Sequence, residues 1–263
     1  MITLYDSPFS PFARKVRLAL EHKGLAHEVI DGLAKQNHDA LRAVNGRVEV
    51  PVLVHDAVTV VNSADIIAYL ERVFPEAPVY PAEPSEYVRA RAWERCSDSL
   101  LDSILTDIGY WMWAERPDTM PDGLLDKARA DLDHVYAALE RDLEGRVFLC
   151  GDRISIAEIA LFPHLVATRA TGVPLDRARF GRVYAWFSAL RKLPLFAADV
   201  ERIKQFMASG LATSSYERRK LFWRGDRIEW LLASGYHAWF AGEIAADRVL
   251  WPGLAIPEPR ASR

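Results

Sequence analysis

Ser10 is the first side chain in this sequence whose position favours chemistry. Residues 2–6 alternate like a short strand, and helical spacing begins at Phe12, so Ser10 with Pro11 marks a helix N-terminus. Backbone N–H groups and the helix dipole favour an anion there, and a hydroxyl can donate a hydrogen bond to a thiolate. A plain N-cap serine, which stabilises a helix by about 1 kcal/mol, is the alternative. Ser7 is a weaker candidate of the same kind.

The second candidate is the Val50-Pro51 pair, which stands between a polar loop and the β-branched run 52–54. Proline cannot donate to a strand's hydrogen-bond ladder, and an X-Pro bond is the one peptide bond at which the cis form costs little. A cis bond there would turn the backbone of Val50 outward and offer it to an extended peptide. A trans proline that starts an edge strand is the alternative.

The third candidate is Asn62-Ser63, which opens a predicted helix with Ile66, Ile67 and Leu70 on its apolar side. Ser63 at a helix N-terminus suits a carboxylate, although a simple N-cap explains it as well. We expect the three candidates to meet at one edge of one small sheet. Together they would offer a thiolate site, a peptide-docking edge and a carboxylate site, which suits a short thiol peptide.

The elements that must position these residues lie in the first 78 residues. Their order, βαβαββα, predicts an α/β layer with a mixed sheet whose first two strands are parallel. Four prolines between residues 75 and 84 predict a stiff linker. Beyond it we expect no strand, but helices at 86–114, 124–143, 155–171, 183–193 and 195–207.

We therefore divide the chain into an α/β domain at 1–78, an all-helical domain at 85–209 and an extension at 210–263. The extension holds four of the eight tryptophans, which is too much aromatic surface for a disordered tail. We expect it to form two more helices, at 219–232 and 236–249, that pack on the helical domain.

Composition excludes several classes of protein. The net charge is −3 and the basic residues are dispersed, which argues against nucleic-acid binding. No apolar run reaches the length of a membrane span, and the N-terminus shows no signal-peptide pattern. The two cysteines, Cys96 and Cys150, have no metal-ligand spacing. They favour buried thiols in a cytoplasmic protein without a metal.

Four segments, in order, give the chain a resemblance to the cytosolic glutathione S-transferase superfamily over nearly its whole length. The fourth contains Ser155 and Glu158 at capping-box spacing, which we interpret as a folding element. The segments are SPFSPFARKVR at 7–17, VPVLV at 50–54, NSADIIAYL at 62–70 and GDRISIAE at 151–158.

The resemblance implies a thioredoxin-like first domain with a cis bond at Val50-Pro51. It implies that glutathione binds the Val50 backbone at its cysteinyl part and Ser63, helped by Asn62, at its γ-glutamyl carboxylate. The catalytic serine or cysteine position of the family falls on Ser10, so we expect a serine-type, bacterial-like member. The catalytic tyrosine of other members would fall near Asp6, which leaves Tyr5 on the opposite face of the strand.

Two departures from the family pattern matter. Asn62 stands where the family usually has a carboxylate or glutamine, which affects the grip on the ligand's amino group; Asp65, one helical turn on, is a second candidate. The loop 45–49 also lacks the common Asn-Pro-x-Gly form. Gln36 and His38, with Lys35, lie where such proteins reach for the glycyl carboxylate, and a solvated surface is the alternative there.

We expect the acceptor pocket between the domains, lined by the first long helix of the second. We assign to it Phe9 and Phe12, with Tyr110, Trp111 and Trp113 from an unusually aromatic run. Core packing explains that run equally well. The three residues of the run cannot share one helical face, so at least one points elsewhere.

The resulting hypothesis is a transferase that activates glutathione as a thiolate and conjugates it to an apolar electrophile, with no metal or redox cofactor. One alternative is a glutathione-dependent lyase or dehalogenase with a dedicated substrate. Another is a non-catalytic binding or scaffold protein of the same fold. The resemblance also implies a homodimer, with the first domain of one chain against the helical domain of the other.

Overall fold

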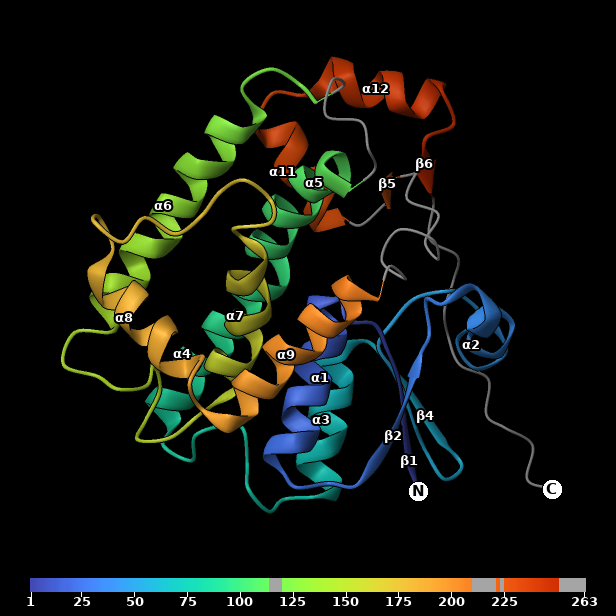
Figure 1. Cartoon of the computed structure of the whole chain (residues 1–263), viewed down its shortest axis with the longest axis vertical. Coiled ribbons are helices and arrows are strands. Elements are labelled where there is room, and N and C mark those ends of the chain that lie inside the picture. Colours follow the sequence, from blue (N-terminus) through green and yellow to red (C-terminus); the bar gives the residue numbers. More distant parts are fainter. Residues whose placement is uncertain (114–119, 210–220, 223–224, 251–263) are drawn as a thin grey trace. The chain divides into compact units, whose positions relative to one another are not determined.

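The computed structural model of the chain describes residues 1–113, 120–209, 221–222 and 225–250, with side chains for 1–109, 120–209 and 228–249. These residues belong to two compact units (Figure 1). The first contains residues 1–81 and 191–209, and the second contains residues 82–190 and the described part of the extension. Among the described residues, no helix has the length and apolar character required to cross a membrane.

A four-stranded mixed sheet forms the centre of the first unit, as the sequence predicts. Its strand order is β2-β1-β3-β4. Strand β1 pairs with β2 in parallel and with β3 antiparallel, and β4 closes a hairpin with β3. The strands are β1 Ile2–Asp6, β2 His27–Asp31, β3 Val52–His55 and β4 Val58–Val61.

Helices cover both faces of this sheet (Figure 1). Helices α1, Pro11–His22, and α3, Ser63–Val73, lie on one face, and α2, His38–Asn45, lies on the other after a short 3-10 turn at Lys35–Asn37. Tyr5 packs with Leu41 and Val52 on the α2 side, whereas its neighbour Asp6 contacts Arg17 of α1. Tyr5 therefore lies on the opposite face from Asp6, as expected from the period of a strand.

Helix α9, Pro194–Ala208, belongs to the first unit, although it follows the helical domain in sequence. It packs against α1. The domain division at 85–209 followed sequence order, and the structure instead places residues 191–209 with the sheet. The physical reason is a buried acid, Asp199, whose partners are arginines of α1.

The second unit is mostly helical. Its first long helix is continuous from α4 into α5 through a π-helical turn at Ser97–Leu101. Leu149 and Ser155 both donate backbone hydrogen bonds to Glu158 at the start of α7, which confirms the predicted capping box. The helices are α4 Pro84–Cys96, α5 Asp102–Trp113, α6 Leu124–Asp142, α7 Ile156–Ala167 and α8 Gly181–Leu190.

The extension adds α11, Gly225–Ala233, and α12, His237–Ala245, to the second unit. Trp230 of α11 donates a hydrogen bond to Asp131 of α6, with 2.9 Å between Nε1 and Oδ2. The expectation of no strand beyond the linker is wrong, because β5, Leu221–Phe222, pairs in parallel with β6, Val249–Leu250. Two-residue strands are too short to show an alternating pattern.

Candidate functional site

Ser10 is the N-cap of α1, and Pro11 holds the first helical position. Its Oγ accepts a hydrogen bond from the backbone N–H of Ala13 at 3.2 Å, and the side chain is partly exposed. Among the described residues, no group accepts a hydrogen bond from the Ser10 hydroxyl. The hydroxyl hydrogen is therefore available to a bound anion, and the first turn of α1 adds its own N–H groups to the same site.

The loop that carries Ser10 rests on two buried residues at the end of β1. Asp6 Oδ1 accepts a hydrogen bond from the backbone N–H of Ser7 at 2.7 Å, and the Ser7 carbonyl accepts one from Ser10 at 3.0 Å. Ser7 is fully buried and its Oγ accepts from the backbone N–H of Phe9 at 3.4 Å. Its burial assigns Ser7 to the support of the loop and leaves Ser10 as the more accessible hydroxyl.

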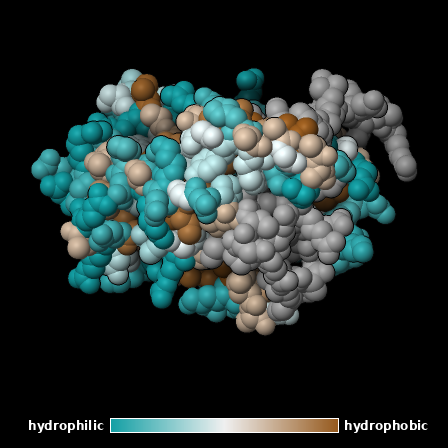
Figure 2. All heavy atoms as spheres, turned by 90° about the horizontal axis from the view of Figure 1, so that it is seen from above, coloured by the Kyte–Doolittle hydropathy of each residue, from teal (hydrophilic) through white to brown (hydrophobic). Residues whose placement is uncertain are grey.

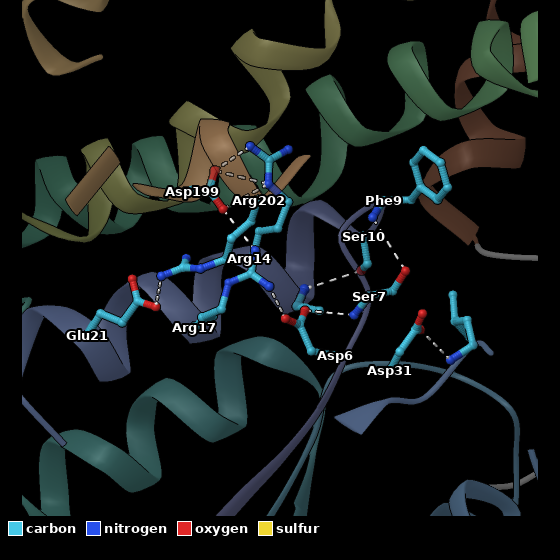
Figure 3. Close-up of polar contacts among 12 residues, drawn as sticks. Asp6, Ser7, Phe9, Ser10, Arg14, Arg17, Glu21, Asp31, Asp199 and Arg202 are labelled. Atoms are coloured by element: carbon cyan, nitrogen blue, oxygen red, sulfur yellow. Dashed lines mark hydrogen bonds and ion pairs between the residues drawn. The ribbon is translucent and has the colours of Figure 1, made fainter. Parts of the chain in front are cut away.

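Beneath this loop lies a buried ion cluster that sequence reasoning missed (Figure 3). We define it as Asp6 of β1, Arg14 and Arg17 of α1, and Asp199 of α9. Arg17 bridges the two carboxylates, and Arg14 binds Asp199 through Nε and Nη2. All four side chains are buried. The sequence signal was weak: two arginines three residues apart in α1 look like a solvated face until their acids are known.

The two acids of the cluster differ in their titration. Burial raises the pKa of Asp6 above its ordinary value, and the attraction of Arg17 only partly offsets it. Burial also acts to raise the pKa of Asp199, but the two arginines around it outweigh that effect and lower the pKa. Asp199 is therefore the firmly ionised member that holds the arginines in place.

The Val50-Pro51 peptide bond is cis, as expected from the resemblance. The N–H and C=O of Val50 have no hydrogen-bond partner within the described part of the chain. Gly32, which was not singled out from the sequence, lies beside this segment: a Cβ on Gly32 would meet Val50 Cγ1 at 2.7 Å. Only glycine fits at that position without displacing Val50, which a conserved pattern could have shown but a single sequence could not.

Asn62 and Ser63 both lie at the start of α3. Asn62 is the N-cap, with an unusual φ of 66°, and Ser63 is the first helical residue and is buried. Asn62 Nδ2 donates a hydrogen bond to Asp65 Oδ2 at 3.1 Å on the exposed surface. The structure thus brings the Asp65 carboxylate next to the Asn62 amide.

The sheet register brings the three candidate segments to one edge. Tyr5 pairs with Val52, and Val52 pairs with Val61. The chain leaves β1 toward Ser10, enters β3 from Val50-Pro51 and leaves β4 toward Asn62-Ser63 at these ends. The edge predicted from the sequence is therefore formed within one unit.

The remaining predicted residues are less closely tied to this edge. Gln36 is exposed, and the His38 ring donates a hydrogen bond from Nε2 to the Leu33 carbonyl at 2.8 Å. Phe9 makes an edge-to-face contact with Phe206 of α9, with ring centroids 4.9 Å apart, and Phe12 is partly buried. The side chains of Tyr110, Trp111 and Trp113 lie outside the described residues.

Both cysteines belong to the second unit, whereas the three candidate segments belong to the first. Burial raises the pKa of Cys96 to about 11 and that of Cys150 to about 12. Both are therefore protonated thiols at neutral pH and poor nucleophiles.

Two family models match the chain. The model described as "Glutathione S-transferase, N-terminal domain" matches residues 4–78, and "Glutathione S-transferase, C-terminal domain" matches residues 112–189. Among curated relatives, glutathione transferase GST 23 of Zea mays is 31% identical over 218 residues, which cover 76% of this chain and 94% of the relative. Glutathione S-transferase 1 of Dianthus caryophyllus is 30% identical over 213 residues, 78% and 93% of the two chains.

Among solved structures, a glutathione S-transferase from Methylobacterium radiotolerans is 27% identical with a TM-score of 0.60. The match covers 76% of this chain and 94% of that one, which was solved in complex with glutathione sulfonate. The two family models together match both the sheet that carries the candidate site and much of the helical region that follows it.

Proposed function

We propose a serine-assisted mechanism for this chain, which belongs to the cytosolic glutathione S-transferase superfamily and is a glutathione transferase. The observation that carries the proposal is the Ser10 hydroxyl, which accepts a hydrogen bond at the N-terminus of α1 but donates none within the described chain. A glutathione thiolate at this point would receive that hydrogen bond. A charge-assisted hydrogen bond and a helix terminus together lower a thiol pKa by about one to two units.

The chemical step follows from that stabilisation. The glutathione thiol releases its proton to solvent, and the Ser10 hydroxyl hydrogen-bonds to the thiolate that remains. The sulfur then forms a bond with an electrophilic carbon. On an aryl halide the carbon–halogen bond breaks and halide leaves to solvent; on an activated double bond the π electron pair moves to the neighbouring atom, which takes a proton from solvent. The protein contributes a larger thiolate fraction at neutral pH and a fixed position for the nucleophile. Ser10 keeps its own proton, so no strong base is needed beside it.

Four further groups would hold the peptide. The Val50 N–H and C=O would pair with its cysteinyl backbone, as with an added strand. The buried Ser63 at the N-terminus of α3 would take the γ-glutamyl carboxylate. The Asn62–Asp65 pair would take the amino group, because Asp65 supplies the negative charge that Asn62 lacks. We assign the glycyl end to Gln36 and His38.

We propose an apolar electrophile, because Phe9 and Phe12 flank Ser10 in sequence and are only partly buried. The two free thiols fit a reducing, cytoplasmic environment.

Substitution of Ser10 by alanine tests the catalytic part of the proposal. We expect normal retention on immobilised glutathione and about a 10- to 100-fold loss of kcat/KM with an aryl halide, which corresponds to about one to two pKa units. Full activity of Ser10→Ala with normal retention would contradict the serine role.

We also propose a two-fold dimer. In support, the second unit carries an open groove of about 380 Å³ between α4 and α6. Trp93, Leu100 and Val135 are among its apolar lining residues, and Arg89, His134 and Asp142 also line it. Val58 of β4 and Val73 of α3 are exposed on the first unit. In the coloured part of the face shown in Figure 2, hydrophilic residues predominate and hydrophobic residues lie in separate groups. Light scattering of the full chain should give twice the mass of one chain, and Leu100→Glu should halve it. A mass near one chain for the unaltered protein would rule the dimer out.

A further inference from the structure

Helix α9 carries one buried carboxylate, Asp199, that both arginines of the ion cluster share. Arg14 lies 2.6 Å from Asp199 through Nη2 and 3.2 Å through Nε, and Arg17 Nη2 lies 2.9 Å from Asp199 Oδ1. The Asp199 side chain is 0% exposed and both arginine side chains are 4% exposed. Because a buried guanidinium is stable only when it is paired, Asp199 fixes the positions of both head groups.

One route of contacts leads from Asp199 to the N–H of Ser10. Arg17 Nη1 contacts Asp6 Oδ2, and the other oxygen of Asp6 accepts from the Ser7 N–H at 2.7 Å. The Ser7 carbonyl in turn accepts from the Ser10 N–H at 3.0 Å. Figure 3 shows Asp199, Arg17, Asp6 and Ser7 in this order, with Ser10 above Ser7.

A second, shorter route leads to the carbonyl of Ser10. The backbone N–H of Arg14 donates to the Ser10 carbonyl at 3.0 Å, and the Arg14 side chain is the one that grips Asp199 with two nitrogens. Both backbone groups of Ser10 are therefore bound to residues that the ion cluster holds. The position of the Ser10 hydroxyl follows from its backbone, because an N-cap side chain has a narrow range of geometry.

We propose that Asp199 is a positioning residue for Ser10, a role that rests on the proposed function of that serine. Asp199 acts through Arg17, Asp6 and Ser7 along one route and through Arg14 along the other. Loss of its charge leaves two buried guanidinium groups with Asp6 as their remaining acid in the cluster, so the arginines and the loop must shift. A displacement of about 1 Å at a reacting group costs up to about 100-fold in rate.

The test uses the full chain and three variants: Ser10→Ala, Asp199→Asn and the double variant. The pKa of enzyme-bound glutathione is read from the ultraviolet absorbance of its thiolate across a pH series, alongside kcat and KM. We expect Asp199→Asn to raise that pKa in the same direction as Ser10→Ala and to lower kcat about 10-fold or more, with little change in KM for glutathione. In the double variant the pKa should equal that of Ser10→Ala, because both changes act on one hydrogen bond.

The matched control is Glu21→Gln. Glu21 of α1 pairs with Arg202 of α9 at 2.5 Å, so this ion pair joins the same two helices without lying on either route to Ser10. A merely structural role for Asp199 predicts that both variants lose thermal stability and that neither shifts the thiol pKa. An unchanged thiol pKa in both Asp199→Asn and Glu21→Gln would overturn the proposal. A double variant whose thiol pKa shift equals the sum of the two single shifts would also overturn it.

Two further measurements keep the test decisive. If Asp199→Asn does not fold, Arg14→Lys keeps the charge but loses the two-nitrogen contact with Asp199, and an unchanged thiol pKa in that variant counts against the proposal. Asp199→Glu should restore part of the activity.

If Ser10→Ala itself leaves the thiol pKa unchanged, the serine mechanism fails and the positioning role fails with it. If Ser10→Ala shifts the pKa and Asp199→Asn does not, only the positioning role fails.

Discussion

Ser10 and Ser155 are both N-cap serines, and the two regions around them show how the same local motif serves different ends. Ser155 is buried, accepts from the Ala157 N–H at 3.2 Å and donates from Oγ to Glu158 Oε2 at 2.8 Å. Ser10 is partly exposed and accepts from the Ala13 N–H at 3.2 Å, but no acceptor for its hydroxyl hydrogen occurs in the described chain.

The difference lies in the residue three positions on. Glu158 follows Ser155 at that spacing and uses up its hydroxyl, whereas Ala13 follows Ser10 and leaves the hydroxyl hydrogen available. A cap serine whose hydroxyl hydrogen is already bonded stabilises only its helix. A cap serine whose hydroxyl hydrogen is available, at a partly exposed helix terminus, can also stabilise an anion. The serine proposed to be catalytic is thus distinguished from the structural serine by its hydrogen-bond partners.

Removal of the Glu158 carboxylate should give the largest effect on stability. Glu158→Ala leaves three donors without their acceptor in a buried place: the Leu149 N–H, the Ser155 N–H and the Ser155 hydroxyl. We expect a loss of about 3–5 kcal/mol in the free energy of unfolding, since each buried unsatisfied donor costs about 1–3 kcal/mol. Urea unfolding measures this, and a loss below about 1 kcal/mol would show that the cap is not a folding element.

At Ser10 the larger effect should be on catalysis. Ser10→Ala loses the hydrogen bond to the thiolate, worth about 1.4–2.7 kcal/mol in the activation free energy for about one to two pKa units. It should cost only about 0.5–1 kcal/mol of stability, as for an exposed cap. Paired measurements of kcat/KM and urea unfolding give the two numbers. A stability loss larger than the catalytic loss would make Ser10 a cap like Ser155.

Ser155→Ala should reduce stability more than activity, which is the reverse of the effect expected for Ser10→Ala. We expect a loss of about 1–2 kcal/mol in the free energy of unfolding, as for other buried caps. The kcat of the folded protein should not change, because Ser155 belongs to the second unit and its hydroxyl is bound to Glu158. A changed kcat at a temperature well below unfolding would contradict the assignment.

The smallest effect concerns pH and the ion cluster that supports Ser10. The pKa of Asp199 is lowered in the folded state, so its ionised form stabilises the fold above the ordinary pKa of about 3.8, and this contribution disappears as the pH falls through the folded pKa. The stability difference between the unaltered chain and Asp199→Asn should therefore be constant near neutral pH and shrink below about pH 4. A difference that grows on acidification would contradict this sign.

Much of the fold could be predicted because its signals are local. The strand at 2–6, the Ser10-Pro11 helix start and the Ser155–Glu158 box each depend on spacing within a few residues, and each occurs in the structure. The strand pair β5–β6 could not be predicted, because two residues carry no periodicity. The membership of α9 in the first unit could not be predicted either, because it depends on a contact 182 residues apart in sequence, between Arg17 and Asp199.

The residues of the candidate site likewise divide into those that the sequence indicated and those that only the structure showed. The sequence predicted Ser10, Val50-Pro51 and Asn62-Ser63 as site residues, because helix starts and X-Pro bonds have local sequence signatures. Gly32 was not, since its role depends on the close approach of the Val50 side chain. Helical spacing indicated Asp65 as a second candidate for the ligand's amino group, and its hydrogen bond with Asn62 was found only in the structure.

The sequence by itself determined the order of elements, the family and the serine at the helix start, because these depend on neighbours along the chain. Only the tertiary structure decided that the Ser10 hydroxyl hydrogen has no acceptor in the described chain, while that of Ser155 is bound to Glu158. It also decided that two arginines of α1 are buried against Asp199. The physical reason is that a buried charge or hydroxyl is defined by partners that folding brings from distant parts of the chain.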